Sequence, residues 1–222
     1  MREPISSLQK TYNVYLAVNS QLKKKNFFKN EKIKISKKKI FFLNLKLNKT
    51  TSENIFLFLS KFVIKISNFF KKSNFYFSVV LGDRYETLLF SYLCSLKKIP
   101  LVHFHGGEAT YGAIDENYRH AISKLSSLHF VSTEKYKKKL ISMGENPRFI
   151  HNIGSMSYFA IKNYNFKKLN SLKKKYDFLN QNKNYVLVTL HPETYSKKTI
   201  AQQISPVFRC IKKYENLIFI FS

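Results

Sequence analysis

Carboxylate, imidazole and guanidinium side chains gather in one part of the sequence, between Asp83 and His120. Three stretches hold them, at residues 82–86, 103–108 and 112–120. Carboxylates and imidazoles can move protons during a reaction, and guanidinium groups bind anions such as phosphate. The sequence therefore indicates acid–base chemistry on an anionic substrate.

The first stretch has a glycine turn, Gly82, after an apolar run, and it puts Asp83 and Arg84 at the start of an expected helix. Glu86 follows Asp83 at the spacing of a capping box, in which side-chain oxygens accept hydrogen bonds from backbone N–H groups at the helix start. Spacing alone favours capping for these two carboxylates. Catalysis is the alternative.

The second stretch carries two histidines, a glycine pair and a glutamate. The two-residue period of a strand would place His103 and His105 on the same side. Gly106 and Gly107 allow positive φ or a close approach of the backbone to a ligand, and they leave Glu108 at the mouth of the expected crevice. A single histidine here would be interpreted as a hydrogen-bonded core imidazole, but the cluster favours a functional site.

The third stretch combines acidic and basic groups on the first two turns of an expected helix. Asp115 with Arg119, and Glu116 with His120, have the i,i+4 spacing of surface salt bridges. The same groups suit acid–base work beside the glycine pair. Much later in the chain, His191 follows an apolar run and is expected to face a crevice between two domains. A metal site formed by His103, His105 and His120 is a weak alternative, because their spacing fits no recognised metal site, so no metal is expected.

From residue 77 onward, short β-branched or aromatic runs alternate with longer segments of helical period. This alternation is typical of an α/β fold with a Rossmann-like parallel sheet. We predict strands at Phe77–Leu81, Leu101–His105, Leu128–Ser132, Phe149–Asn152, Tyr185–Leu190 and Leu217–Phe221. We predict helices over residues 85–97, 115–126, 133–143, 155–163, 167–180 and 197–214. Ligand crevices of such sheets lie beyond the carboxyl ends of the strands, which is where the polar stretches fall.

Upstream of this region the pattern is weaker. We predict a strand within Tyr12–Val18, one or two short strands within Lys32–Leu45, and a long helix over Ser52–Lys72. Thr133 is the candidate N-cap, and Gly144 the candidate C-cap, of the helix between them.

A polar run at residues 180–184 marks a domain boundary. We expect an N-terminal Rossmann-like domain over residues 1–165 that lacks its first strand, a linker helix region over residues 166–184, and the truncated start of a second Rossmann-like domain over residues 185–222. A buried parallel strand needs neighbours, and no further strand follows the apolar run at residues 217–221. The chain is therefore expected to be a fragment that lacks both ends.

Composition narrows the class of partner. The 222 residues carry a formal net charge of +26. The excess of positive charge is nearly all lysine, whereas nucleic-acid recognition favours arginine, so no nucleic acid is expected as a partner. A basic nucleic-acid-binding module is kept as the alternative function.

Lys61 and Lys65 interrupt the most apolar stretch, so no membrane partner is expected. Cys94 and Cys210 are interpreted as reduced, and Met1–Gln9 shows no signal peptide, so a cytoplasmic location is expected.

The polar stretches together resemble one family, the UDP-N-acetylglucosamine 2-epimerases of the hydrolysing branch. The resemblance is densest between Ser78 and Gly154, and it is carried by residues 80–86, 103–108, 112–116, 119–130 and 188–192. It implies two Rossmann-like domains of the glycosyltransferase-B type with the substrate between them. It also implies a homo-oligomer for a full-length form.

The resemblance implies the chemistry as well. Family members eliminate UDP across C1 and C2 of UDP-N-acetylglucosamine, or of UDP-N,N'-diacetylbacillosamine, and then add water. The product is a free 2-epimeric amino sugar, a precursor of sialic or legionaminic-type acids. On this resemblance the catalytic carboxylates are Asp83, Glu108 and Asp115, and which of them takes the proton stays open. The candidates for substrate binding are Arg84, His103, His105, Gly106, Gly107, Arg119, His120 and His191. Both steps are proton transfers, so no cofactor is expected.

The sequence departs from the family pattern in three respects. Some members carry a carboxylate where His105 stands, the Gly-Thr-Arg loop after the family's first strand is absent, and most of the second domain is missing beyond Ser222. The histidine-glycine-glycine-glutamate run argues against a non-hydrolysing epimerase.

Overall fold

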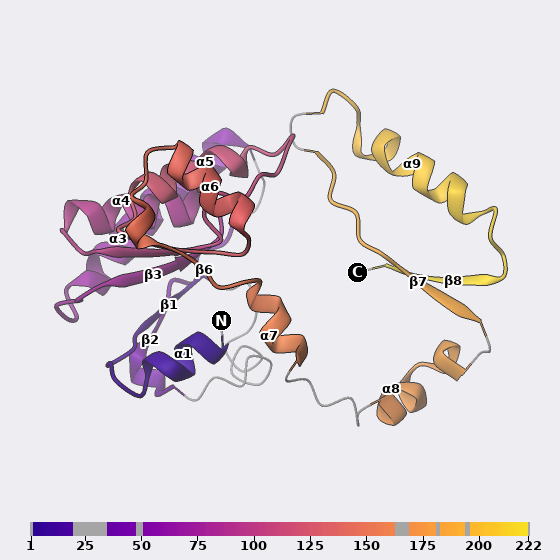
Figure 1. Ribbon diagram of the computed structural model, residues 1–222, viewed down its shortest axis with the longest axis horizontal. Coiled ribbons are helices and arrows are strands. Elements are labelled where there is room, and N and C mark those ends of the chain that lie inside the picture. The colour runs from indigo at the N-terminus through magenta and orange to yellow at the C-terminus, as the bar shows by residue number, and fades with distance from the viewer. Residues whose placement is uncertain are drawn as a thin grey trace. The chain divides into compact units, whose positions relative to one another are not determined.

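The computed structural model describes residues 2–19, 35–47, 51–162, 169–180, 183–193 and 196–221. The chain divides into two compact units. Unit 1 comprises Met1–Ala109 and Asp115–Ala160, and unit 2 comprises Thr110–Ile114 and Ile161–Ser222. Each unit has its own parallel strands and helices (Figure 1).

Unit 1 is organised around a four-stranded parallel sheet with the order β3-β4-β5-β6. Its strands are β3 (Ser78–Leu81), β4 (Leu101–Phe104), β5 (Leu128–Val131) and β6 (Ile150–Asn152). The helices that follow these strands are α4 (Tyr85–Leu96), α5 (Asp115–Lys124), α6 (Glu134–Ser142) and α7 (Met156–Lys162). A 3-10 helix at Pro147–Phe149 leads into β6. The predicted α/β class with a parallel sheet is confirmed.

The long predicted helix is present as α3 (Ser52–Phe70). The hydroxyl of Thr51 caps it by accepting a hydrogen bond from the backbone N–H of Asn54. One apolar stripe of the helix is formed by buried side chains that recur every three or four residues: Phe58, Phe62, Ile66 and Phe69. Of the helices in the described residues, none is long and apolar enough to cross a membrane.

Helix α6 is delimited by the two residues that the sequence indicates. The hydroxyl of Thr133 accepts a hydrogen bond from a backbone N–H of the first turn. At the other end, Gly144 has a φ of 89°. The N–H of Gly144 donates to Ile141, and the N–H of Glu145 donates to Leu140, which together make a Schellman termination. Both predicted caps are confirmed.

Unit 1 also holds a two-stranded parallel sheet made of β1 (Leu16–Val18) and β2 (Ile40–Phe42). Helix α1 (Arg2–Leu8) precedes this sheet, and a 3-10 helix at Lys37–Lys39 leads into β2. Strand β1 covers only the last three residues of the candidate strand Tyr12–Val18, and β2 is a short strand within Lys32–Leu45, as predicted. Residues 32–34 of the second predicted segment lie outside the described residues.

Unit 2 contains the parallel pair β7 (Asn184–Val188) and β8 (Leu217–Phe221), with α9 (Ile200–Ile211) between them in the chain. Upstream lie α8 (Leu169–Lys175) and a 3-10 helix (Asp177–Asn180). The single helix predicted over residues 167–180 is therefore wrong in its second part, and residues 167–168 lie outside the described range. The three domain limits drawn from the sequence stay predictions.

Candidate active site

The candidate site lies in unit 1 at the carboxyl ends of β3, β4 and β5. Asp83, Glu108 and Ser132 each follow one of these strands. Neighbouring parallel strands end at the same edge of a sheet, so side chains that are distant in the sequence meet there. The carboxylates of two predicted catalytic residues thus enter one hydrogen-bonded network.

Arg119 on α5 ties the loops after β3 and β4 together. It is buried, with 5% of its surface exposed. Its Nη2 donates to Oδ2 of Asp83, and its Nη1 donates to the backbone oxygen of Glu108 at 2.6 Å. A buried guanidinium needs such partners because an unpaired charge in the interior is costly. Its planar fork allows one side chain to bind both loops.

The side chain of Glu108 is held by two further residues. Its Oε1 accepts a hydrogen bond from the Ser132 hydroxyl at 2.7 Å and from Nδ1 of His105 at 2.6 Å. A carboxylate only accepts, so this bond requires the proton of His105 to be on Nδ1. Burial by itself would raise the pKa of Glu108, but the bonds from His105 and Ser132, together with the charges of His105 and Arg119, outweigh burial and hold this pKa below its usual value. Glu108 is therefore ionised at neutral pH.

The backbone at His105 adopts a left-handed conformation, with a φ of 65°. Its N–H still donates to the oxygen of Phe130 on β5 at 2.9 Å, and the chain then leaves the sheet. Non-glycine residues seldom adopt such angles, and when they do the conformation is often found at functional sites. This turn, rather than regular strand geometry, brings the His105 ring to Glu108.

His103 has no exposed surface. Its Nε2 donates to the backbone oxygen of Gly82 at 3.0 Å, and its Nδ1 lies 3.1 Å from the hydroxyl of Ser123 on α5. Burial is the main reason that the pKa of His103 falls from 6.5 to about 4, and the charge of Arg119 also disfavours protonation. The neutral ring links β4 to α5 and to the loop that carries Asp83.

Gly106 and Gly107 are buried against protein atoms. A Cβ on Gly106 would lie 2.9 Å from Oγ of Ser123, and one on Gly107 would lie 2.7 Å from the backbone oxygen of Tyr136 on α6. Gly107 also has a φ of 74°, which confirms the positive φ allowed for in the sequence. In this structure the glycine pair lets the loop approach α5 and α6 closely.

Asp83 does not cap the helix that follows it. The N-cap of α4 is Arg84, which makes no side-chain capping bond, and Arg119 binds the carboxylate of Asp83. Glu86 is bound by the exposed Arg84, with 2.8 Å between Nε and Oε1. The capping interpretation is therefore wrong, because both carboxylates form ion pairs instead.

Asp115 and His120 lie on the first two turns of α5, and Asp115 is its first residue and partly exposed. Nε2 of His120 lies 3.5 Å from Oε1 of Glu116, which confirms the predicted i,i+4 pair. Both ring nitrogens of His120 are buried and make no hydrogen bond to the described residues. A buried imidazole in this state can bind a polar group of a ligand.

Sequence reasoning overlooked two serines of the site, Ser132 and Ser123. Ser132 directly follows β5, so the rule that identified Asp83 and Glu108 also applies to it. Ser123 stands four residues after Arg119 on one face of α5. The sequence signal was the place of Ser132 directly after an expected strand, and the place of Ser123 one turn after Arg119 on an expected helix.

The remaining site candidate, His191, is exposed on the segment after β7 in unit 2, and its expected place at a crevice stays a prediction. Within the described residues, no group of three or more His, Cys, Asp or Glu side chains is arranged to hold a metal ion.

A parallel α/β sheet with charged side chains at its carboxyl edge is the arrangement of α/β proteins that bind ligands at strand ends. The family described as UDP-N-acetylglucosamine 2-epimerase matches residues 20–222, and this chain belongs to that family.

Curated relatives include two bacterial proteins. GDP/UDP-N,N'-diacetylbacillosamine 2-epimerase (hydrolyzing) from Campylobacter jejuni is 44% identical over 144 residues, which are 65% of this chain and 37% of that protein. Polysialic acid biosynthesis protein P7 from Escherichia coli is 36% identical over 174 residues, which are 78% of this chain and 44% of that protein. The chain thus spans less than half the length of these relatives.

Solved structures agree on the fold. UDP-GlcNAc 2-epimerase from Neisseria meningitidis, bound to UDP-GlcNAc, matches 100% of this chain with a TM-score of 0.81 and 20% identity, and the chain covers 61% of it. The Methanocaldococcus jannaschii enzyme in complex with UDP-GlcNAc and UDP matches 98% of the chain with a TM-score of 0.74 and 21% identity, again over 61% of that structure. The predicted likeness to glycosyltransferase-B-type epimerases is confirmed at the level of fold.

Proposed function

We propose that this chain carries the acid–base residues of a hydrolysing UDP-sugar 2-epimerase, which converts UDP-N-acetylglucosamine and water into UDP and the free 2-epimer. The observation that carries the proposal is the Arg119 link, which holds Asp83 and the backbone of Glu108 at one edge of the sheet. The family match supports the same reaction class.

The proposed reaction needs a base at C2 of the sugar and negative charge near C1, because C1 and the ring oxygen become positive as UDP leaves. Glu108, with its lowered pKa, is ionised and able to act in either role. Asp83 offers a second carboxylate on the neighbouring loop. These two residues form the proposed acid–base pair, and Asp115 assists from the start of α5.

Other residues of the site hold these groups in place or bind the substrate. Ser132 and His105 position the carboxylate of Glu108. His103 has no exposed surface, so we assign it a positioning role through Gly82 in place of the substrate contact that the sequence suggested. His120, with its unsatisfied nitrogens, remains a candidate for substrate contact, and so do Arg84, Arg119 and His191.

Isotope exchange tests the proposal. The chain is joined to those portions of the Campylobacter jejuni relative that lie outside the matched 37%, at both ends, and the joined protein is supplied with UDP-N-acetylglucosamine in deuterium oxide. The expected result is UDP release with deuterium at C2 of the free sugar, because elimination removes that proton and the later steps return one from solvent. Release without deuterium would rule out elimination.

Two isosteric variants of the same protein identify the base. Glu108→Gln and Asp83→Asn each remove one ionisable group, and the variant that loses C2 exchange identifies the proton acceptor. Glu53→Gln, at the start of α3, is the matched control and should retain exchange. Full exchange in both site variants would contradict the assignment of these carboxylates.

UDP-N,N'-diacetylbacillosamine is the second candidate substrate. The observation in its favour is the 44% identity to a relative whose name specifies a diacetylbacillosamine 2-epimerase. Comparing kcat/KM for the two UDP-sugars in the joined protein decides between them. With this substrate the product would lie on the route to a legionaminic-type acid.

Several expectations from the sequence stay predictions alongside this proposal. They are a cytoplasmic location, a homo-oligomer for a full-length form, and a reaction without a cofactor, a nucleic acid or a membrane. The net charge of +26 is the one feature that favours nucleic acid. Binding to DNA that weakens steeply with added salt would support that alternative.

A further inference from the structure

When water adds to C1 in the second step of the proposed reaction, one proton of that water must leave. Asp83 and Glu108 are the proposed acid–base pair for the proton transfers at C2, which leaves the proton from water without an assigned acceptor. The acceptor has to lie at the same edge of the sheet and to take up a proton at neutral pH. Imidazole is the side chain that most often does so.

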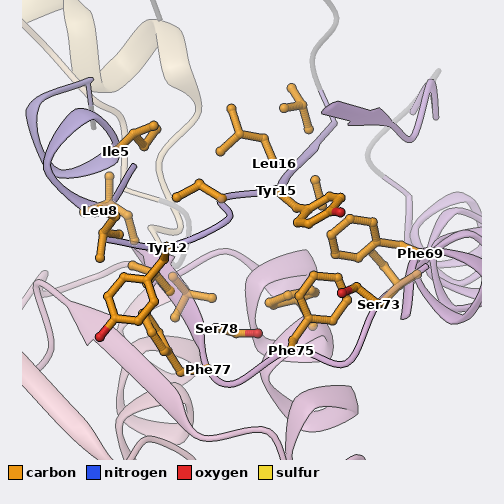
Figure 2. A pocket seen from close by; sticks show the side chains of 18 of the residues that line it. Ile5, Leu8, Tyr12, Tyr15, Leu16, Phe69, Ser73, Phe75, Phe77 and Ser78 are labelled. Atoms are coloured by element: carbon orange, nitrogen blue, oxygen red, sulfur yellow. The ribbon is translucent and has the colours of Figure 1, made fainter. Parts of the chain in front are cut away.

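A cavity of about 940 Å³ in unit 1 does not supply this group. Aromatic side chains such as Tyr12, Tyr15, Phe75 and Phe77 line it (Figure 2). The described residues of its lining include no histidine and neither carboxylate of the proposed pair. The candidates are therefore the histidines of the site at the carboxyl ends of β3, β4 and β5.

Two of the three site histidines in unit 1 have no ring nitrogen that water can reach. His103 has no exposed surface, and both of its ring nitrogens have partners. Both ring nitrogens of His120 are buried. The side chain of His105 is 23% exposed, and its Nε2 makes no hydrogen bond to the described residues. Because this Nε2 is also not one of the buried atoms that lack a partner, it lies where water can reach it.

Glu108 determines which nitrogen of His105 is free to accept a proton. Nδ1 donates its proton to Oε1 of Glu108 at 2.6 Å, so the lone pair of the neutral ring is on Nε2. Histidine general bases use this arrangement, in which a carboxylate holds Nδ1–H and Nε2 takes the proton. The pKa of Glu108 lies below its usual value, so Glu108 stays ionised and its negative charge stabilises the imidazolium that forms.

The ring of His105 is held in a fixed position. The backbone N–H of His105, where φ is 65°, donates to the oxygen of Phe130 at 2.9 Å. Oε1 of Glu108 also accepts a hydrogen bond from the hydroxyl of Ser132 at 2.7 Å, which fixes the carboxylate that orients the ring. A general base is effective when its geometry is fixed relative to the reacting atoms. These contacts thus present one lone pair at a defined place on the edge of the sheet.

We propose that Nε2 of His105 accepts the proton of the water molecule that adds to C1. The inference rests on the proposed function. The water oxygen bonds to C1 while one of its O–H bonds breaks and the proton passes to Nε2. The electron pair of the C1–C2 double bond takes up a proton at C2 from the protonated carboxylate. The imidazolium then releases its proton to solvent, which restores the neutral ring for the next turnover.

The test uses His105→Asn in the joined protein. The Nδ2 donor of asparagine takes the place of Nδ1 and can keep the bond to Glu108, and asparagine tolerates a positive φ, but it has no basic nitrogen. UDP formation, measured in quenched samples, should continue. Hydration of supplied 2-acetamidoglucal, the unsaturated sugar that elimination leaves, should be roughly 100-fold slower or worse in the presence of UDP. His151→Gln, at an exposed position of β6, is the matched control and should keep both rates.

The outcomes separate this inference from the proposed function. A wild-type joined protein that forms no UDP would contradict the proposed function itself. If the wild-type protein is active and His105→Asn hydrates 2-acetamidoglucal at the same rate, only the role of His105 is overturned. UDP formation and hydration that slow by the same factor would also overturn it, because His105 would then act only through the position of Glu108.

A measurement on the unsubstituted chain tests the tautomer. In a chain that contains ¹⁵N-labelled histidine, two-bond ¹H–¹⁵N correlations at pH 8 should show the proton of His105 on Nδ1 and the lone pair on Nε2. The opposite tautomer would overturn the proposal, and this result is decisive even if His105→Asn fails to fold.

Discussion

The buried imidazole of His103 makes the stability of the chain depend on pH. Its pKa falls from 6.5 in the unfolded chain to about 4 in the folded one, chiefly because of burial. Between these two pKa values the unfolded state binds more protons than the folded state. The stability that the neutral His103 contributes is therefore fully present above pH 6.5, declines as the pH falls, and is lost below about pH 4. The full difference corresponds to roughly 3 kcal/mol, and the part expressed by pH 5 is about 2 kcal/mol.

The perturbation that isolates this contribution is His103→Gln. Glutamine does not titrate, and its amide can still donate to the backbone oxygen of Gly82. Urea denaturation followed by far-UV circular dichroism gives the free energy of unfolding at pH 7.5 and pH 5. We expect the wild-type value to fall between these two conditions by about 2 kcal/mol more than the value for the variant. This range avoids the acid region in which carboxylates such as Glu108 also contribute.

His129 serves as the internal comparison. Burial lowers its pKa as well, against the opposing charge of Glu145, so it contributes to the wild-type slope with the same sign. His129→Gln should flatten the curve mainly through its own contribution, and it should also reduce that of His103 slightly, because the charge of His129 helps to lower the pKa of His103. If His103→Gln has the same pH dependence as the wild type, the imidazole of His103 is not held neutral by burial, and its positioning role fails with it.

Three further substitutions follow from the site. Ser132→Ala removes a hydrogen bond that lowers the pKa of Glu108, so this pKa should rise. NMR titration of the isotope-labelled carboxyl carbon of Glu108 measures the change, and an unchanged pKa would contradict the role of this hydrogen bond. Arg119→Met removes the hydrogen-bond donor of the partly buried Asp83 carboxylate and of the Glu108 carbonyl. The free energy of unfolding, measured by urea denaturation, should fall by roughly 3–5 kcal/mol, and a fall near zero would refute the central role of the guanidinium. Gly107→Ala strains a positive φ and meets a backbone oxygen at 2.7 Å, so it should cost at least about 2 kcal/mol. Gly154→Ala, with a φ of 77° and open space around it, is the matched control and should cost less.

The alternation of strands and helices could be predicted from the sequence because its signals are local. The hydroxyl of Thr133 and the positive φ of Gly144 act within one helical turn, and α6 has the ends that they indicate. The single helix predicted over residues 167–180 failed because a run of helix-forming residues does not reveal where a helix divides. The three-residue strands β1 and β2 are too short for a two-residue period to define their ends.

At the site, contacts between residues distant in the sequence determine where the side chains lie, and local spacing does not predict these positions. The period of a strand placed His103 and His105 on one side, but β4 ends at Phe104 and the positive φ of His105 breaks the period. One imidazole therefore enters the core while the other meets Glu108. Similarly, Asp83 stands at the spacing of a helix cap, yet a guanidinium from another helix binds it.

The loops after β3 and β4 both bind Arg119, so a movement of Arg119 affects both of them. Any ligand that shifts α5 along its axis will change the surroundings of Asp83 and of Glu108 in the same event. The charge of Arg119 also helps to hold the pKa of Glu108 below its usual value, so the same movement will change that pKa. One helix thus positions the carboxylate of Asp83 and the backbone of Glu108 at the same edge of the sheet.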